Sequence, residues 1–170
     1  MLDQKVAQLL NDQINKELYS AYLYLDIANY YIHEGLNGYG NWYTIQAQEE
    51  QDHAMLMMKY LQNNGHAVEL GAVDAPNCTF ENFKQPLVKA YQHEQYVTSL
   101  INTIYDAAYA VKDFRTMQFL DWFVKEQGEE ETNATDLIKK MELFGSDPKG
   151  LYMLDQELAA RTYAAPSLTL

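Results

Sequence analysis

The same spacing of side chains that can bind metals occurs twice in the chain: an acid, a polar side chain 33 residues later, and a histidine or second acid three residues after that. The two sets are Glu17, Glu50 and His53, and Glu94, Gln127 and Glu130. Residues three apart on a helix lie on one face, about one turn from each other. A turn signal lies within each set, at 35–38 and at 112–113. Each set is therefore expected to fold back to one height in a helical hairpin, and two packed hairpins bring all six side chains to one interior level.

The four glutamates of these sets fall at core-facing positions of the expected helices. Buried carboxylates brought together repel one another and resist ionisation, and a pair of metal ions removes that penalty. Fe²⁺ and Fe³⁺ accept carboxylate oxygen and imidazole nitrogen, and Glu50, between the two sets, is expected to bridge two ions. A single Glu-x-x-His pattern has little specificity, and the alternative is a buried polar network or a solvated seam. The doubled spacing favours the metal site.

Length, charge and composition exclude several classes of protein. The 170 residues fit one domain with a sizeable core. Lys+Arg is 12 and Asp+Glu is 24, a formal charge of −12, which argues against nucleic acid as a partner and suits a protein that attracts cations. Cys78 is the only cysteine, so we expect neither an internal disulfide nor a cysteine-based zinc or iron–sulfur site. No secretory signal opens the chain and no apolar run approaches roughly 18 residues, so we expect a cytoplasmic protein without a membrane partner.

Apolar periodicity predicts an all-α fold, a four-helix bundle with a short fifth helix. The expected helices run from Asp3 to about His33, from Asn37 to Asn64, from a start between Asn82 and Leu87 to about Val111, from Asp113 to about Phe144, and from Lys149 to about Ala160. Between Gly65 and about Glu81 the periodicity disappears, and a crossover of this length lets the third helix run parallel to the second. We expect residues 1–160 to form the bundle with its fifth helix, and residues 161–170 to form a C-terminal tail without a clear pattern.

Some interior positions are expected from the same periodicity. The apolar stripe of the first helix comprises Val6, Leu9, Leu10, Ile14, Leu18, Tyr22 and Leu25, and core filler in the second comprises Met55, Met57 and Met58. Tyr24 lies seven residues after Glu17 and on the same face. Because helical side chains lean toward the helix N-terminus, Tyr24 is expected to point toward Glu17.

The chain resembles the ferritins over nearly its whole length, and most closely the bacterial non-haem ferritins. The resemblance rests on the stretches Glu17-Leu18-Tyr19-Ser20-Ala21-Tyr22-Leu23-Tyr24, Ala47-Gln48-Glu49-Glu50-Gln51-Asp52-His53-Ala54, Glu94, Trp122-Phe123-Val124-Lys125-Glu126-Gln127-Gly128-Glu129-Glu130-Glu131 and Gly150-Leu151-Tyr152-Met153-Leu154-Asp155. Together these stretches are highly specific.

The resemblance implies an iron-storage protein with a ferroxidase centre inside each subunit. Fe²⁺ would be oxidised there by dioxygen or peroxide, and ferric mineral would collect in a hollow shell of twenty-four identical subunits. The implied ligands of the first iron are Glu17, Glu50 and His53. The implied ligands of the second iron are Glu50, Glu94 and Glu130, with Gln127 nearby. Tyr24 and Trp122 resemble aromatic residues close to the centre in relatives, where either type can donate an electron or simply pack.

The chain departs from other branches of the family in ways that narrow the prediction. Bacterioferritins carry a second Glu-x-x-His, where this chain reads Gln127-x-x-Glu130, and they bind haem through a methionine at the position that is Gln51 here. We therefore expect no haem. One cysteine cannot build the iron domain of rubrerythrins. The acidic positions that line the three-fold pores of animal ferritins fall on Met117 and Leu120, so the iron entry route is left open.

A third metal position is expected beside the two-iron level. Glu49 adjoins Glu50, and Glu126 and Glu129 are three apart on the fourth helix. A step of one residue turns a side chain by about 100°, which places these acids beside the two-iron face, on the side toward the cavity of a shell. Non-haem bacterial ferritins, which the chain resembles, carry a third iron there. The alternative is a solvated acidic run.

Two other functions compete with the ferroxidase. A non-enzymatic shell could take up iron oxidised elsewhere, but the complete ligand set disfavours it. A DNA-protecting mini-ferritin is disfavoured by the acidic charge, by the fifth helix and by the position of the metals, which lie between subunits in that class.

Overall fold

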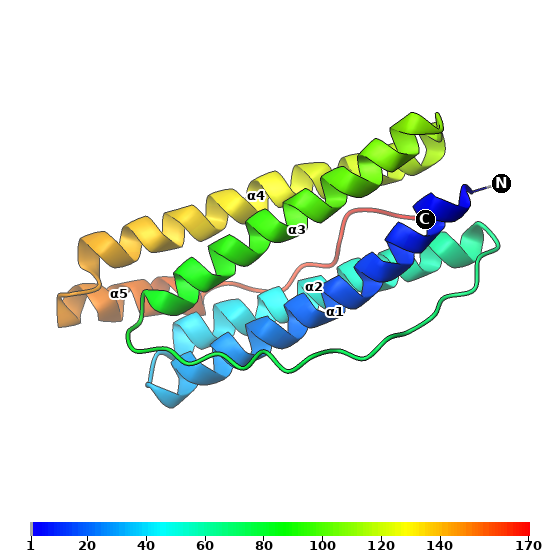
Figure 1. Cartoon of the computed structure of the whole chain (residues 1–170). Coiled ribbons are helices and arrows are strands. Elements are labelled where there is room, and N and C mark those ends of the chain that lie inside the picture. Colours follow the sequence, from blue (N-terminus) through cyan, green and yellow to red (C-terminus); the bar gives the residue numbers. More distant parts are fainter. Residues whose placement is uncertain (1) are drawn as a thin grey trace.

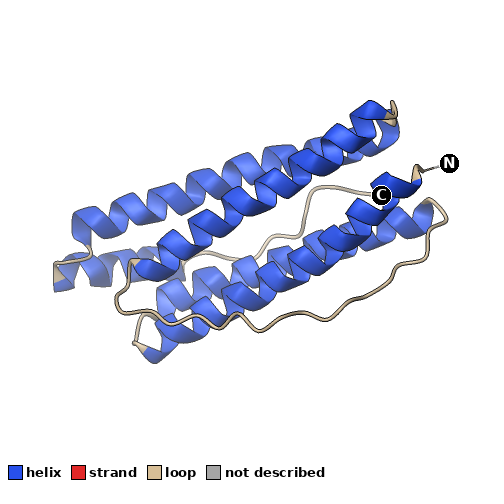
Figure 2. Ribbon diagram, viewed as in Figure 1, coloured by secondary structure: helices blue, strands red, loops and turns tan. Residues whose placement is uncertain are grey.

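The structure is a computed structural model that describes residues 2–170, and within that range all regular structure is helical (Figure 2). The helices are α1 (Gln4–His33), α2 (Asn37–Asn63), α3 (Gln85–Ala110), α4 (Phe114–Phe144) and α5 (Pro148–Ala159). The expected all-α class, the four long helices and the short fifth helix are confirmed, with ends that differ by one or two residues. No helix in residues 2–170 is both long and apolar enough to cross a membrane.

The four long helices form two antiparallel hairpins, α1 with α2 and α3 with α4, that pack side by side (Figure 1). A long crossover joins them along the side of α1. Asn11 holds it there with a pair of 2.9 Å hydrogen bonds to the carbonyl and N–H of Glu69, and the Asn15 amide donates to the carbonyl of Ala72 at 2.9 Å. Because the crossover returns the chain to the other end of the bundle, α3 runs parallel to α2, as the sequence predicts.

Aspartates cap the N-termini of three helices, and residues with positive φ lie in the turns that follow α1 and α3. Asp3, Asp113 and Asp147 each accept a hydrogen bond from backbone N–H groups in the first turn of α1, α4 and α5, which satisfies donors that the helix leaves free. The α1–α2 turn contains Gly35 at φ 84°, a conformation that glycine adopts without strain. The α3–α4 turn places Lys112 at φ 57°, at the position where the sequence predicts the second turn.

A layer of buried polar side chains divides the core into two apolar clusters. One cluster contains Leu10 and Ile14 of α1, and the other contains Leu23 and Ile27 further along the same helix, with Glu17 between them. Each of the other three long helices also contributes to both clusters and has buried polar residues between the two parts. The members of the polar layer are Gln13, Glu17, Ser20, Gln46, Glu50, His53, Glu94, Gln127 and Glu130. The bundle thus buries its acids at one level, between two apolar ends.

Two details of the expected core are wrong. Tyr22 and Leu25 are about half exposed, at 50% and 47%, and Leu23 and Tyr24 point inward instead. Residues seven apart stay almost in line on a helix, so the buried face of α1 follows Glu17 and Tyr24. A step of two residues turns a side chain by about 200°, so Tyr22, two before Tyr24, and Leu25, two after Leu23, turn outward. Among the three methionines of α2, Met57 is buried and Met55 is exposed, for the same reason.

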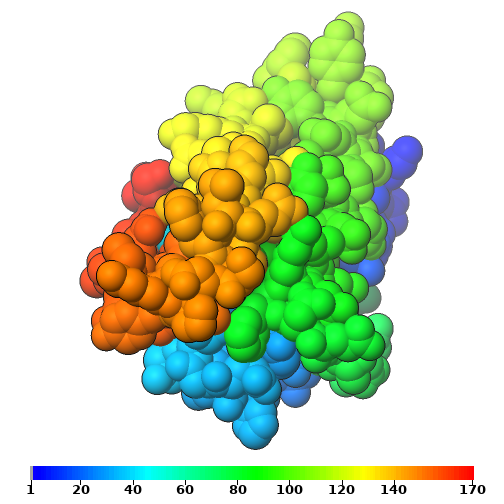
Figure 3. All heavy atoms as spheres, turned by 90° about the vertical axis from the view of Figure 1, so that its left-hand side faces the viewer, coloured from blue at the N-terminus to red at the C-terminus, as the bar shows by residue number. Residues whose placement is uncertain are grey.

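The short fifth helix is fixed to the start of α2 by one buried carboxylate. Leu36, the N-cap residue of α2, has no side chain that can accept a hydrogen bond. Asp155 of α5 accepts hydrogen bonds from the first turn of α2 instead. The Asp155 Oδ1 accepts hydrogen bonds from the N–H groups of Gly38 at 2.7 Å and Tyr39 at 3.0 Å. A Cβ atom on Gly38 would overlap the backbone carbonyl of Asp155, so the close approach requires glycine. Figure 3 shows this end of the molecule, with α5 (orange-red) against the beginning of α2 (light blue).

Gly38→Ala tests this contact. We expect it to lower the free energy of unfolding by about 1–3 kcal/mol, because the added methyl group overpacks the α2–α5 contact. Gly128→Ala is the matched control, since Gly128 lies inside α4 with open space around it and should gain about 0.5–1 kcal/mol in the helix. Thermal unfolding of both variants is the measurement. Equal effects of the two substitutions would contradict the proposed role of Gly38.

Candidate metal centre

Glu17 of α1 and Glu50 and His53 of α2 converge in the polar layer. One ligand atom of each lies within 4.8 Å of the others, and this is the one group of three or more His, Cys, Asp or Glu residues in residues 2–170 that meets this distance. The Nδ1 atom of His53 lies 3.4 Å from Glu50 Oε2. All three residues are at most 3% exposed. The α1–α2 hairpin therefore brings the first predicted ligand set together.

The second predicted set lies at the same level but is less tightly grouped. Glu94 of α3 accepts a hydrogen bond from Gln127 Nε2 of α4 at 3.0 Å, and Glu130 accepts one from Gln46 Nε2 of α2 at 2.8 Å. The charges of Glu94 and Glu130 both raise the pKa of Glu50, after the larger effect of its burial, so the two sets adjoin. Glu94 and Glu130 also line a cavity of about 10 Å³, close to the space that one water molecule fills.

The hydroxyl of Tyr24, the residue expected to point toward Glu17, donates to Glu94 of α3. The phenol is long enough to reach from α1 across to α3, and Glu17 already accepts a hydrogen bond from Gln13 Nε2 at 2.9 Å. Tyr24 is 1% exposed, so this contact lies within the polar layer. Tyr24 therefore links one hairpin to the second set of acids in the other.

Two glutamines of the layer were not predicted. Gln13 precedes Glu17 by four residues and Gln46 precedes Glu50 by four, so each lies one turn away from a predicted ligand. Gln13 and Gln46 are also 33 residues apart, the same interval that separates Glu17 from Glu50. That interval is the sequence signal that could have found them. Both amides donate to carboxylates of the layer.

Burial dominates the electrostatics of the layer. It raises the pKa of Glu17 and Glu50 well above the ordinary value, and it raises that of Glu94. The pKa of Glu130 rises to about 8, first through burial and then through the charge of Glu94. Among the described residues, Glu17 Oε2 and Glu50 Oε1 are buried without a hydrogen-bond partner. Such oxygens cost free energy, and a bound cation supplies what they lack.

Aromatic rings cover the histidine of the first set. Trp122 and Phe123 of α4 lie edge-on to His53, with ring centroids at 5.5 and 5.7 Å. Trp122 thus lies next to a candidate ligand, as the resemblance to the ferritins implies. These rings restrict the orientation of the imidazole from the side of the apolar cluster.

The residues of the expected third position are neighbours, but they are not gathered into a tight group. Glu49 pairs with Arg161 at 2.7 Å, and Glu129 lies 3.5 Å from Lys125 on the surface of α4. Partial burial raises the pKa of Glu126, and the charges of Glu129 and Glu49 raise it further, so the three carboxylates affect one another. Their ligand atoms do not all lie within 4.8 Å of one another, as those of the first set do.

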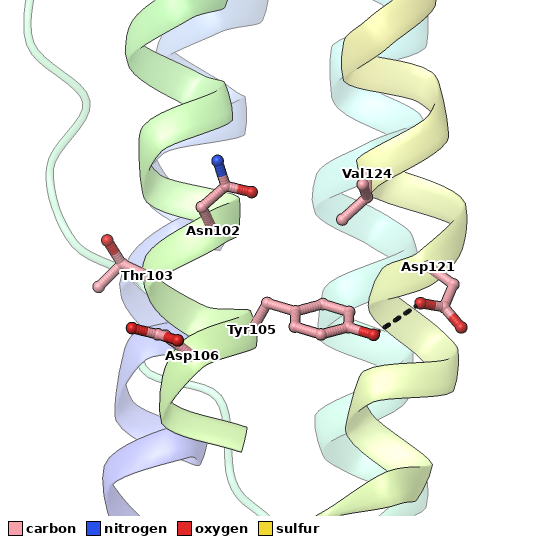
Figure 4. A pocket seen from close by; sticks show the side chains of 6 residues that line it. All are labelled: Asn102, Thr103, Tyr105, Asp106, Asp121 and Val124. Atoms are coloured by element: carbon pink, nitrogen blue, oxygen red, sulfur yellow. Dashed lines mark hydrogen bonds between the residues drawn. The ribbon is translucent and has the colours of Figure 1, made fainter. Parts of the chain in front are cut away.

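The structure also locates features that lie away from the polar layer. Leu120, one of the two positions compared with pore residues, is fully buried in the apolar core, and Met117 packs against the same cluster. A surface pocket of about 590 Å³ lies between α3 and α4 (Figure 4). Its lining residues are Asn102, Thr103, Tyr105, Asp106, Asp121 and Val124. None of the predicted ligands lines this pocket, so the candidate site is the interior layer.

A four-helix bundle with glutamates and a histidine at one interior level has the architecture of the di-metal carboxylate proteins. The model of the ferritin-like domain matches residues 7–144 of this chain. The chain belongs to the ferritin family. Membership supports a role in iron storage, and the group Glu17, Glu50 and His53 is compatible with a di-iron site.

Relatives match the chain over most of its length. It is 40% identical over 156 residues to a bacterial non-heme ferritin of Campylobacter jejuni, covering 92% of this chain and 93% of that one. It is 34% identical over 163 residues to a bacterial non-heme ferritin of Staphylococcus aureus, covering 96% and 98%. A solved structure of an open pore ferritin from Archaeoglobus fulgidus superposes with a TM-score of 0.93 at 41% identity, over 95% of this chain and 100% of that one. The expected resemblance is confirmed.

We predict that the stability of the metal-free protein falls as the pH rises from about 5 to about 8. The pKa of Glu130 lies near 8 in the folded protein, against 4.5 for the free side chain, so unfolding releases its proton between these values. Glu17 and Glu50 act in the same direction. The midpoint of thermal unfolding with a chelator present is the measurement. Glu130→Gln should make this pH dependence shallower, and a midpoint that rises over the window would contradict the account.

Proposed function

We propose that the protein is a ferroxidase that stores iron. In this proposal Glu17, Glu50 and His53 bind one Fe²⁺, and Glu50, Glu94 and Glu130 bind a second, with Gln127 beside it. The observation that carries the proposal is the buried layer of four carboxylates, two of which have an oxygen without a hydrogen-bond partner. Two divalent cations would neutralise that charge and satisfy those oxygens.

The residues of the layer would position the metals, and the electrons come from iron. Each of two Fe²⁺ gives up one electron, and dioxygen accepts both together with two protons, forming hydrogen peroxide. With peroxide as the oxidant, the same two electrons and two protons give two molecules of water. Glu50 would bridge the ions, and the protons that leave Glu50 and Glu130 as metal binds are available to the reduced oxidant.

Neighbouring side chains would hold the ligands in place. Tyr24 fixes one oxygen of Glu94, and Gln127 fixes the other at 3.0 Å. Gln46 orients Glu130, and the two rings of α4 orient His53. Such outer contacts set the direction of a ligand's lone pairs, and their loss commonly costs metal affinity.

The ferric product would move to a store inside a shell of identical subunits. We propose a shell of twenty-four copies, supported by the match to an open pore ferritin over the whole of that chain. A third, all-oxygen position at Glu49, Glu126 and Glu129 would lie on the way to the cavity, with Glu130 able to touch both. The charge of −12 suits uptake of Fe²⁺. A non-enzymatic shell is the second candidate, and the complete ligand set argues against it.

His53→Ala and Glu50→Ala test the catalytic assignment. We expect either variant to oxidise Fe²⁺ roughly a hundredfold more slowly than the wild type while the shell still assembles, because each change removes a ligand. His33→Ala and Glu34→Ala are matched controls at exposed positions near the end of α1. Stopped-flow absorbance after mixing the anaerobic ferrous protein with air is the measurement. Wild-type rates in His53→Ala or Glu50→Ala would exclude the proposed centre.

The two iron positions should differ in affinity. Only the first position has an imidazole. The second is offered Glu50, Glu94 and Glu130, with only the neutral Gln127 added. Imidazole nitrogen binds Fe²⁺ more firmly than an amide does. Anaerobic titration of the metal-free protein with Fe²⁺, followed by calorimetry, should therefore show two steps, and His53→Ala should remove the tighter one. A single step for two equivalent ions would argue against this assignment.

A further inference from the structure

The C-terminal segment 160–170, called the tail here, crosses the face of the bundle formed by α2 and α4 (Figure 1, red). It lacks regular structure, yet side chains hold it at several points. The Tyr163 hydroxyl donates to Asp52 of α2 at 2.5 Å, and Trp122 Nε1 of α4 donates to the Ser167 hydroxyl at 3.0 Å. Leu168 packs against the apolar cluster. These contacts place the tail over α2 and α4, the helices that carry Glu49 and Glu126. The crossover lies elsewhere, along α1.

Arg161 makes the most extensive of these contacts. Its Nη2 atom lies 2.7 Å from Glu49 Oε2, and its Nη1 donates to the carbonyl of Trp42 at 3.3 Å. The guanidinium also lies over the Trp42 ring, 4.0 Å from the centroid. The Asn41 amide donates to the Arg161 carbonyl at 3.0 Å, which fixes the backbone. The side chains of Arg161 and Glu49 are only 18% and 20% exposed, so solvent screens this pair less than an ordinary surface pair.

Arg161 is a cation paired with Glu49, one of the acids beside the two-iron level. Glu49 is next to Glu50 in sequence, and its charge acts on Glu126 and Glu130 of α4. Lys125 is on the outer surface and pairs with Glu129 instead. The guanidinium therefore neutralises the acid through which α2 would contribute to the third metal position.

We propose that the tail is a strap over the third metal position, in which Arg161 and a metal ion compete for Glu49. This inference rests on the proposed function. A multivalent cation and a guanidinium repel each other at a shared carboxylate, so metal at Glu49, Glu126 and Glu129 displaces Arg161 and releases the tail. By linkage, the docked tail weakens metal binding there to the same degree. Redocking of the tail then favours departure of the ion toward the cavity.

The strap would also report on its own state. The chain has two tryptophans, and the tail touches both, Trp42 through Arg161 and Trp122 through Ser167. Trp122 in turn lies 5.5 Å from His53. Release of the tail therefore changes the surroundings of a ring that packs on a candidate ligand of the first iron.

Arg161→Gln in the assembled, metal-free protein tests the strap, with Tb³⁺ as an inert, oxygen-preferring probe. Tryptophan-sensitised Tb³⁺ emission gives the binding phases, and the phase that Glu126→Gln removes is assigned to the third position. We expect Arg161→Gln to tighten that phase by about tenfold. Arg115→Gln is the matched control, since it removes the same charge from a guanidinium that donates to Asn64, away from these acids. Its Tb³⁺ affinity should equal that of the wild type.

Hydrogen exchange of the tail gives a readout that does not depend on affinity. In the wild type, saturating Tb³⁺ should speed the exchange of amides in residues 160–170. Tyr163→Phe keeps every charge but loses the bond to Asp52, and it should speed tail exchange without metal and tighten the third phase by a smaller factor. Equal Tb³⁺ affinity in wild type and Arg161→Gln, or tail exchange unchanged by Tb³⁺, overturns the strap and leaves the third position standing. If no Tb³⁺ phase depends on Glu126, both the strap and the third metal position are excluded, and the proposed two-iron centre is unaffected.

Discussion

Four carboxylates buried at one level are the constraint on which the rest of the structure depends. Glu17, Glu50, Glu94 and Glu130 are at most 6% exposed, and burial raises the pKa of each. A core of this kind stabilises the metal-free protein less than an apolar one would. The two apolar clusters on either side compensate for that cost, and they hold the acids at a fixed height. The proposed centre is therefore preorganised by packing, and cations complete it.

The polar layer also connects the two hairpins. Tyr24 of α1 donates to Glu94 of α3, and Gln46 of α2 donates to Glu130 of α4. Each link joins the first hairpin to an acid of the second. The hairpins are not equivalent, because the first supplies Glu50 and His53 where the second supplies Gln127 and Glu130. This asymmetry underlies the expected difference between the two iron positions.

Much of the fold and of the layer could be predicted from the sequence, because spacing along a hairpin fixes height. The intervals from Glu17 to Glu50 and His53 equal those from Glu94 to Gln127 and Glu130, and they place six side chains at one level without knowledge of packing. The partner of Tyr24 could not be found in this way, since it depends on which helix lies across the bundle. The contact of Arg161 with Glu49 spans 112 residues and involves a tail without periodicity, so no local pattern indicates it. The sequence predicts the individual helices, but it does not predict which side chains of different helices or of the tail contact one another.

The most direct test of the account is the position of iron in the subunit. Crystals soaked anaerobically in Fe²⁺ and measured at the iron absorption edge would give anomalous peaks wherever iron binds. The account predicts two strong peaks per subunit inside the bundle, between the two apolar clusters, one next to Glu17 and His53 and one next to Glu94 and Glu130, with Glu50 touching both. Iron found only on the surface of the bundle, with no peak in the carboxylate layer, would contradict it.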